Sequence, residues 1–172
     1  MGQNKTRTEQ LAQGAVIAAL YVALTMLFAP VSFGAVQVRI AEVLTILPLF
    51  TPAAIPGLFI GCVIANLLGG AIVWDVLFGS LATLIGAALG YRLRFNRWLV
   101  PIPAILANTL IIPPILRYGY GIDLPLELIA LQVALGEIAG CYVLGELFAS
   151  ALLQRRNLFG AKKQESGEDP RE

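Results

Sequence analysis

The sequence predicts an all-α membrane protein with six transmembrane helices and with both termini in the cytoplasm. The first observation behind this prediction is composition: 58% of the 172 residues are hydrophobic, 13% are charged, and the mean hydropathy is +0.77. One soluble core cannot bury so much apolar surface, so the chain belongs to the integral membrane class. The second observation is that its basic residues gather in clusters separated by apolar segments, which defines an orientation.

Six apolar segments qualify as spans, because a helix needs about 20 apolar residues to cross a bilayer and fewer when it is short or re-entrant. They are Leu11 to Ala29, Ile40 to Phe50, Ala53 to Gly70, Trp74 to Tyr91, Trp98 to Ile112, and Leu124 to Leu153. Proline disfavours helix continuation, so Thr51-Pro52 is expected to separate the second span from the third, and Pro113-Pro114 to end the fifth. The domain organisation is then a cytoplasmic segment 1–10, a membrane domain 11–153, and a polar cytoplasmic tail 154–172, partly disordered.

Three basic clusters determine the predicted orientation, since cytoplasmic loops carry the excess of lysine and arginine. With six spans, all three clusters fall on one side; they are Lys5 with Arg7, then Arg92, Arg94 and Arg97, then Arg155, Arg156, Lys162, Lys163 and Arg171. Of the twelve basic residues, only Arg39 and Arg117 fall on the other side. If the short second segment did not cross, the clusters would be split across the membrane.

Polar residues gather near the predicted outer ends of the helices, where charges are costly and usually functional. The candidate substrate-binding residues are Arg39, Glu42, Asn66, Asp75, Asn108 and Glu137. Arg39 and Glu42 are three residues apart and can share a helical face. Glu137 and Glu146 are nine apart, so they point in opposite directions on a helix and Glu146 has another role.

Each candidate also has a purely structural interpretation. Arg39 and Glu42 could form an interfacial ion pair without a ligand, and Asn66 and Asn108 could bond across helices. Asp75 could be an N-cap. For Glu137 the functional interpretation is favoured over the structural one, because a buried carboxylate requires a partner. Arg117, Asp123 and Glu127 are expected to be solvated, and Tyr118 and Tyr120 are expected to anchor the interface.

Missing motifs exclude several classes of function. The chain has no G-x-x-x-x-G-K-[ST] phosphate loop, no G-x-S-x-G and no H-E-x-x-H, and it contains no histidine. Cys62 and Cys141 lie in apolar segments, where buried small side chains are the expected interpretation, so we predict no metal and no other cofactor. Its few charges cluster at membrane edges, which gives no support for nucleic-acid binding. We therefore expect a non-enzymatic binding subunit that draws its energy from other proteins.

Small residues form two further patterns. Ala15, Ala19 and Ala23 make a smooth stripe on the first helix, at a spacing that allows close approach of another helix, within the protein or in a partner. Gly86 and Gly90 make a similar pair in the fourth helix, where internal packing is expected.

The sequence resembles the QueT family, substrate-binding S components of energy-coupling factor (ECF) transporters. The resemblance covers residues 11–153 and is most specific in Phe33 to Leu84. It rests on FGAVQVRIAEVLTILP (33–48), TPAAIPGLFIGCVIAN (51–66), DVLFGSLATL (75–84), Asn108, and Gly136 with Glu137.

This resemblance implies a multi-pass protein of a prokaryotic plasma membrane, with the S-component bundle of six helices. It implies capture of a 7-deazaguanine queuosine precursor from outside and delivery to the cytoplasm with the coupling protein EcfT and two ATPases. The alanine stripe would contact EcfT, and toppling of the S component would open its outward pocket to the cytoplasm.

The candidate residues suit such a ligand. Glu42 or Glu137 could accept N1–H and the exocyclic amine, and Asn66 or Asn108 could serve the carbonyl or a ring nitrogen. Asp75 is available for an ammonium if the cargo carries an aminomethyl group. Arg39 would orient Glu42 or donate to the carbonyl. Two alternatives stay open: an S component for another vitamin-like molecule, and a structural membrane subunit without a ligand.

Overall fold

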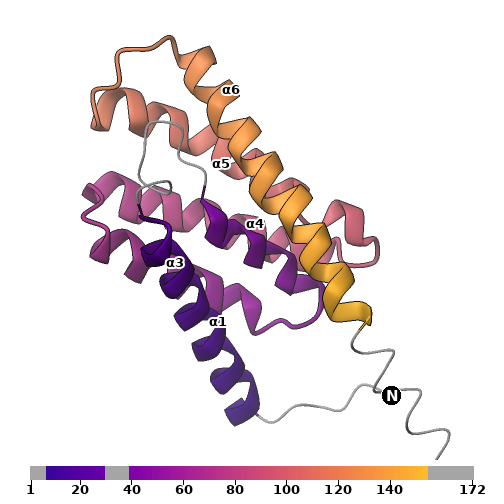
Figure 1. The fold of residues 1–172 in the computed structure, drawn as a ribbon. Helices are drawn as coiled ribbons and strands as arrows, with labels where there is room; N and C mark the ends of the chain where they lie inside the picture. Colours follow the sequence, from indigo (N-terminus) through magenta and orange to yellow (C-terminus); the bar gives the residue numbers. More distant parts are fainter. Residues whose placement is uncertain (1–6, 30–38, 155–172) are drawn as a thin grey trace, which may run out of the picture.

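The computed structural model describes residues 7–29 and 39–154, and this part of the chain forms six helices and no strand (Figure 1). The first three helices are α1 (Arg7–Leu27), η1 (Ile40–Leu49) and α3 (Ala54–Leu68). The fourth helix consists of η2 (Asp75–Gly79) and α4 (Ser80–Arg92), and the fifth of η3 (Arg97–Leu99), α5 (Ile102–Pro114) and η4 (Ile115–Gly119). The sixth consists of α6 (Leu126–Glu137) and η5 (Ile138–Leu144) and continues to Gln154. The all-helical prediction is confirmed for these residues.

Three of these helices are long and apolar enough to cross a membrane: Arg7–Leu27, Arg97–Gly119 and Leu126–Gln154. The apolar helices η1 and α3 are shorter. They are separated at Thr51-Pro52, as the sequence predicts, and the Thr51 hydroxyl accepts a hydrogen bond from the backbone N–H of Ala53 at 3.3 Å. Lys5 and the basic cluster of the tail lie outside the described residues.

The fifth helix does not end at Pro113-Pro114, and that prediction is wrong. Both prolines lie inside α5, and the helix continues through η4 to Gly119. Proline removes one backbone donor and crowds the preceding turn. Here a wider π turn starts directly after Pro114, so the chain accommodates the prolines by widening the helix rather than leaving it.

Close helix packing depends on glycines. A Cβ on Gly57 would lie 2.7 Å from the Gly14 carbonyl oxygen, and one on Gly61 would lie 2.8 Å from Tyr21 Cβ, so α1 and α3 cross almost backbone to backbone. Gly86 and Gly90 pack in the same way against Ala104 and Val100. The expected internal role of this second pair is confirmed.

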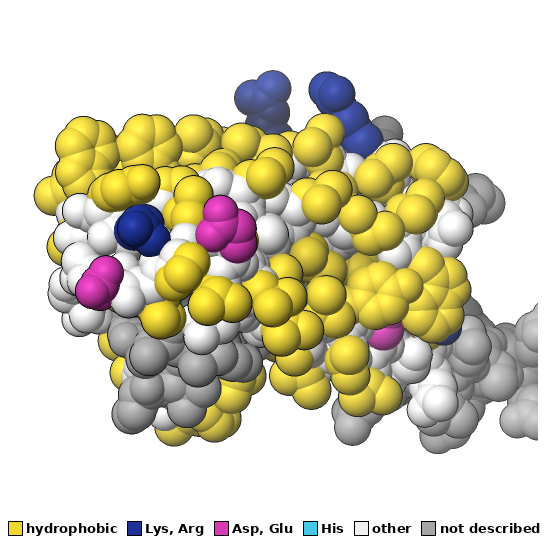
Figure 2. Space-filling model, turned by 90° about the horizontal axis from the view of Figure 1, so that it is seen from above, with side chains coloured by type: hydrophobic (Ala, Val, Ile, Leu, Met, Phe, Trp, Pro, Cys, Tyr) yellow, Lys and Arg dark blue, Asp and Glu magenta, His cyan; other side chains and the backbone are white. Residues whose placement is uncertain are grey.

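The outside of the bundle is apolar, as a lipid-facing surface requires. Figure 2 shows a face covered largely by hydrophobic side chains with few charged groups. Large exposed side chains occur on the long helices, among them Leu11, Leu110 and Leu147. Polar side chains are instead found inside the bundle; the buried set includes Arg39, Glu42, Asn66, Asp75, Asn108 and Glu137.

Candidate functional site

An arginine network, formed by Arg39, Asp75 and Tyr120, closes one end of the bundle. Arg39 precedes η1 in an extended conformation, and its Nη2 lies 3.3 Å from both carboxylate oxygens of Asp75. The Tyr120 hydroxyl donates to Asp75 Oδ2 at 3.1 Å and accepts from the Ile72 N–H at 3.3 Å. Partial burial raises the pKa of Tyr120, and the Asp75 carboxylate raises it further, so the phenol stays a donor.

Asn66 and Gly79 support the position of Asp75. The Asn66 side-chain amide donates to the Asp75 backbone carbonyl at 3.4 Å, which links α3 to the start of the fourth helix. A Cβ on Gly79 would lie 2.7 Å from Asp75 Oδ1, so any larger residue would force this carboxylate to shift from its present position. Asp75 lies in the first turn with Trp74 as the N-cap residue, and its side chain bonds to Arg39 and Tyr120. The N-cap interpretation is therefore wrong.

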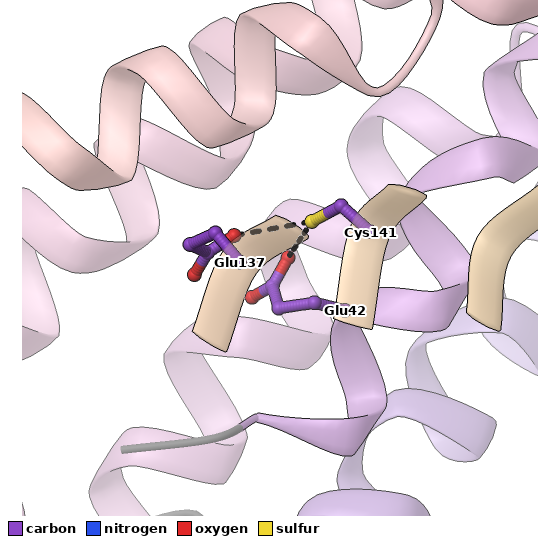
Figure 3. A group of neighbouring side chains, drawn as sticks. All are labelled: Glu42, Glu137 and Cys141. Atoms are coloured by element: carbon purple, nitrogen blue, oxygen red, sulfur yellow. Dashed lines mark hydrogen bonds between the residues drawn. The ribbon is translucent and has the colours of Figure 1, made fainter. Parts of the chain in front are cut away.

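A carboxylate cluster, formed by Glu42, Glu137 and Cys141, lies deeper in the bundle (Figure 3). The three side chains point toward one another, with one donor atom from each within 4.8 Å of the others. Cys141 Sγ lies 3.1 Å from Glu137 Oε2 and 4.0 Å from Glu42 Oε2. The Tyr21 hydroxyl donates to Glu42 Oε1 at 2.7 Å, so α1, η1 and the sixth helix all contribute.

Asn108 stands beside this cluster, with its side-chain amide near the Glu137 carboxylate but outside ordinary hydrogen-bond geometry. The residue is 1% exposed, yet neither amide atom has a hydrogen-bond partner among the described residues. The Ser80 hydroxyl is also buried without a hydrogen-bond partner among the described residues. Since native proteins pair nearly all buried polar groups, an amide of this kind is available to a ligand or a water molecule.

The structure thus divides the six predicted residues into two groups. Arg39, Asn66 and Asp75 bond to one another at the end of the bundle, whereas Glu42, Glu137 and Asn108 gather deeper. The prediction that Arg39 orients Glu42 is wrong, because the extended Arg39 sends its side chain to Asp75. The hydroxyl that orients Glu42 belongs to Tyr21.

Three contributors were missed from the sequence. Tyr120 was expected only to anchor the interface, but it bonds to Asp75. Tyr21 lies in an apolar helix and was not singled out, and Cys141 was expected to be only a small buried side chain. Two spacings were available as signals: Tyr21 lies four residues from Thr25, and Cys141 lies four residues from Glu137, which places each pair on one helical face.

Two carboxylates and a thiol are also donors that a divalent cation accepts. The cluster would supply three ligands from two helices. The expectation that the protein holds no metal rested on the absence of histidine and on the presence of only two cysteines, both in apolar segments, and it stays a prediction.

Other predicted residues lie away from this site. Glu146 pairs with Arg97, with Oε2 3.5 Å from Nε, which links the sixth helix to the start of the fifth. Arg117 donates to the Leu124 carbonyl instead of being only solvated. The alanine stripe is exposed at all three positions, Ala15, Ala19 and Ala23.

Comparison with known proteins identifies the family. Residues 11–154 match the family model described as QueT transporter. A curated relative from Lactococcus lactis subsp. cremoris (strain MG1363), named queuosine precursor transporter QueT, is 38% identical over 97 residues. That alignment spans only about half of each protein, 55% of this chain and 56% of the relative. No solved structure matches. The match over nearly the whole helical region shows that this chain belongs to the QueT transporter family.

Proposed function

We propose that the protein is the substrate-binding S component of an ECF-type importer and that its cargo is a 7-deazaguanine queuosine precursor. Family membership and the name of the Lactococcus relative support transport of such a cargo. The sequence carries no phosphate loop, so the energy of import would come from separate ATPases coupled through an EcfT-like protein.

The observation that carries the proposal is the buried set of Glu42, Glu137 and Asn108. Two carboxylates accept hydrogen bonds, and the Asn108 amide offers one donor group and one acceptor. A 7-deazaguanine presents N1–H, an exocyclic amine and a carbonyl on one edge, which these groups complement. Their burial favours binding, because hydrogen bonds to charged groups are stronger away from water.

The arginine network has a positioning role in this proposal. Arg39 and Asp75 neutralise each other, and Asn66 and Tyr120 hold Asp75 in place. Neither charge of this pair is then available for the cargo. The network fixes the start of η1, and η1 carries Glu42 three residues later.

Sidedness follows from the basic residues. Asp75 starts the fourth helix and Tyr120 follows the fifth, whereas Arg92, Arg94 and Arg97 lie at the opposite ends of these helices. By the positive-inside rule, the arginine cluster faces the cytoplasm and the binding residues face outward. In this topology all six helices cross the membrane, both termini are cytoplasmic, and the protein lies in a prokaryotic plasma membrane.

The coupling surface would be the alanine stripe of α1. Ala15, Ala19 and Ala23 are exposed, while Ile17, Ala18 and Tyr21 on the same helix are buried. Ala15, at one end of the stripe, borders an open cavity of about 640 Å³ between α1 and α3, with Gly14 and Gly57 also among its lining residues. A helix of an EcfT-like protein could approach this surface closely, because the stripe carries only methyl side chains.

A ligand panel tests the proposed function. The purified protein in detergent is incubated with purines, 7-deazapurines and vitamins, and its thermal unfolding is followed, because a ligand that binds only the native state stabilises it. We expect stabilisation by 7-deazaguanines alone. Glu42→Gln should abolish this shift, and the control Glu127→Gln should keep it, since Glu127 is exposed. No shift with any compound would support a structural subunit, and a shift with a vitamin would support an S component of other specificity.

A further inference from the structure

The carboxylate cluster contains more negative charge than the described side chains around it compensate. Arg39 is paired with Asp75, and Arg97 with Glu146. The groups that contact Glu42 and Glu137 are the Tyr21 hydroxyl and the Cys141 thiol, and Asn108 adds an uncharged amide. Two carboxylates whose oxygens lie within 4.8 Å repel each other, so a proton or a bound cation must relieve the repulsion.

A neutral 7-deazaguanine can donate a pair of hydrogen bonds to only one of these two carboxylates. Its N1–H and exocyclic amine form one donor pair, and one carboxylate satisfies that pair. The second carboxyl group would then have to stay protonated, or remain charged beside the ligand without a counter-charge, which is costly in a membrane interior. An ammonium on the cargo removes this cost, because it brings three donors and one positive charge.

Glu42 and Glu137 differ in how firmly they are held. Glu42 is 1% exposed, and its side chain accepts a hydrogen bond from the Tyr21 hydroxyl at 2.7 Å. The Thr45 hydroxyl donates to the Glu42 backbone carbonyl at 2.6 Å. Glu137 is 6% exposed, directly precedes η5, and accepts a hydrogen bond from the Cys141 thiol at 3.1 Å, with the Asn108 amide beside it. Glu42, which accepts from a hydroxyl, suits the planar base edge, and Glu137, which accepts from a weaker thiol donor, suits the charged substituent.

We infer that Glu137 is the specificity-determining residue that binds an ammonium group of the cargo, while Glu42 binds the edge of the 7-deazaguanine. The site then selects a precursor with an aminomethyl substituent over one with a nitrile. This inference rests on the proposed function, and it assigns to Glu137 the role that the sequence suggested for Asp75. Asp75 is unsuited because Arg39 and Tyr120 already occupy its carboxylate.

The first test compares three ligands on the unmodified protein by isothermal titration calorimetry. They are 7-aminomethyl-7-deazaguanine, its neutral isostere 7-ethyl-7-deazaguanine, and 7-cyano-7-deazaguanine. We expect the aminomethyl compound to bind at least about tenfold more tightly than either neutral compound, as a buried charge-assisted contact predicts. Equal affinities would overturn the inference and leave the proposed function standing. No binding of any of the three would overturn the proposed function itself.

The second test uses variants. Glu137→Gln should bring the affinities for the aminomethyl and cyano compounds within about threefold of each other, since it removes the charge but keeps the shape. Glu146→Gln is the matched control on the same helix and should keep the full preference, because Glu146 pairs with Arg97 away from the cluster. If Glu137→Gln kept the preference, Glu137 would not bind the ammonium. The ligand series on the unmodified protein stays decisive if the variant does not fold.

A metal titration separates an organic cation from a metal ion. Cd²⁺ bound to a thiolate gives an ultraviolet charge-transfer band, and the two cysteines provide a control. We expect no band. A band that disappears in Cys141→Ser but persists in Cys62→Ser would identify a metal centre in the carboxylate cluster and overturn the assignment.

Discussion

Arg39 and Asp75 are 36 residues apart in the chain and form a buried ion pair, with Arg39 Nη2 3.3 Å from Asp75 Oδ1. The pair joins the residue before η1 to the first turn of the fourth helix. It therefore connects the segment that carries Glu42 with the helix that Asn66 and Tyr120 also contact. Each charge depends on the other, because a single charge left in the bundle has no water to solvate it.

Asp75→Asn is accordingly predicted to be strongly destabilising. The substitution leaves the Arg39 guanidinium buried without a counter-charge, and breaking a buried pair in this way costs about 3–5 kcal/mol. We expect a clear fall in the midpoint of thermal unfolding of the purified protein. The double variant Arg39→Gln with Asp75→Asn should recover a large part of this loss. An unchanged midpoint in Asp75→Asn would show that the ion pair contributes nothing.

Tyr21→Phe tests the hydrogen bond that positions Glu42. The hydroxyl donates to Glu42 Oε1 at 2.7 Å in a fully packed environment, and Tyr21 is 1% exposed. Its loss should weaken binding of a 7-deazaguanine by about tenfold, which corresponds to about 1.4 kcal/mol. Calorimetry on the purified variant measures this effect.

Tyr118→Phe is the control for that experiment, because Tyr118 is 77% exposed. It should bind the ligand as tightly as the parent protein does. Equal losses in the two variants would mean that Tyr21 acts through the general stability of the bundle rather than through Glu42.

Gly57→Ala is predicted to loosen the crossing of α1 and α3. The added methyl group would lie 2.7 Å from the Gly14 carbonyl oxygen and 3.0 Å from Ile17 Cβ, so the two backbones must separate. Overpacking of this kind costs about 1–3 kcal/mol. Thermal unfolding in detergent measures the loss.

Gly145→Ala is the control for Gly57→Ala, because it adds the same methyl group at a glycine with more space around it. A Cβ at that position would meet Ile46 Cβ at 3.7 Å, an ordinary van der Waals contact. The variant should melt close to the parent. If Gly57→Ala were as mild as Gly145→Ala, the glycine crossing would not be tight in solution.

Periodicity and charge placement predict which residues are buried and polar, but not which of them touch. The hydrophobic segments locate the helices, and the cost of membrane charges singles out Glu42, Asp75 and Glu137, all of which are buried. The partners depend on departures from regular helix geometry. An i, i+3 spacing assumes that Arg39 is helical, whereas it is extended, and so it reaches Asp75 instead of Glu42.

Wide helical turns are the second reason that contacts escape prediction. The π segments η2, η4 and η5 include Asp75, directly precede Tyr120, and contain Cys141. Each inserts extra backbone into a turn and rotates the residues that follow relative to a regular helix. A helical wheel drawn for 3.6 residues per turn therefore misplaces Tyr120, whereas Cys141 still meets Glu137 at the i, i+4 spacing.

Ala19→Leu tests the coupling surface without touching the binding residues. Ala19 is exposed in the centre of the alanine stripe, so a leucine there leaves the bundle intact but prevents close approach of a partner helix. We expect the variant to bind 7-deazaguanine normally and to lose most of its co-purification with an EcfT-like protein. Ala151→Leu places the same side chain on an exposed position of the sixth helix and should co-purify as the parent does. Undiminished assembly of Ala19→Leu would remove the stripe from the proposed interface, and loss of assembly in both variants would assign the effect to general surface changes.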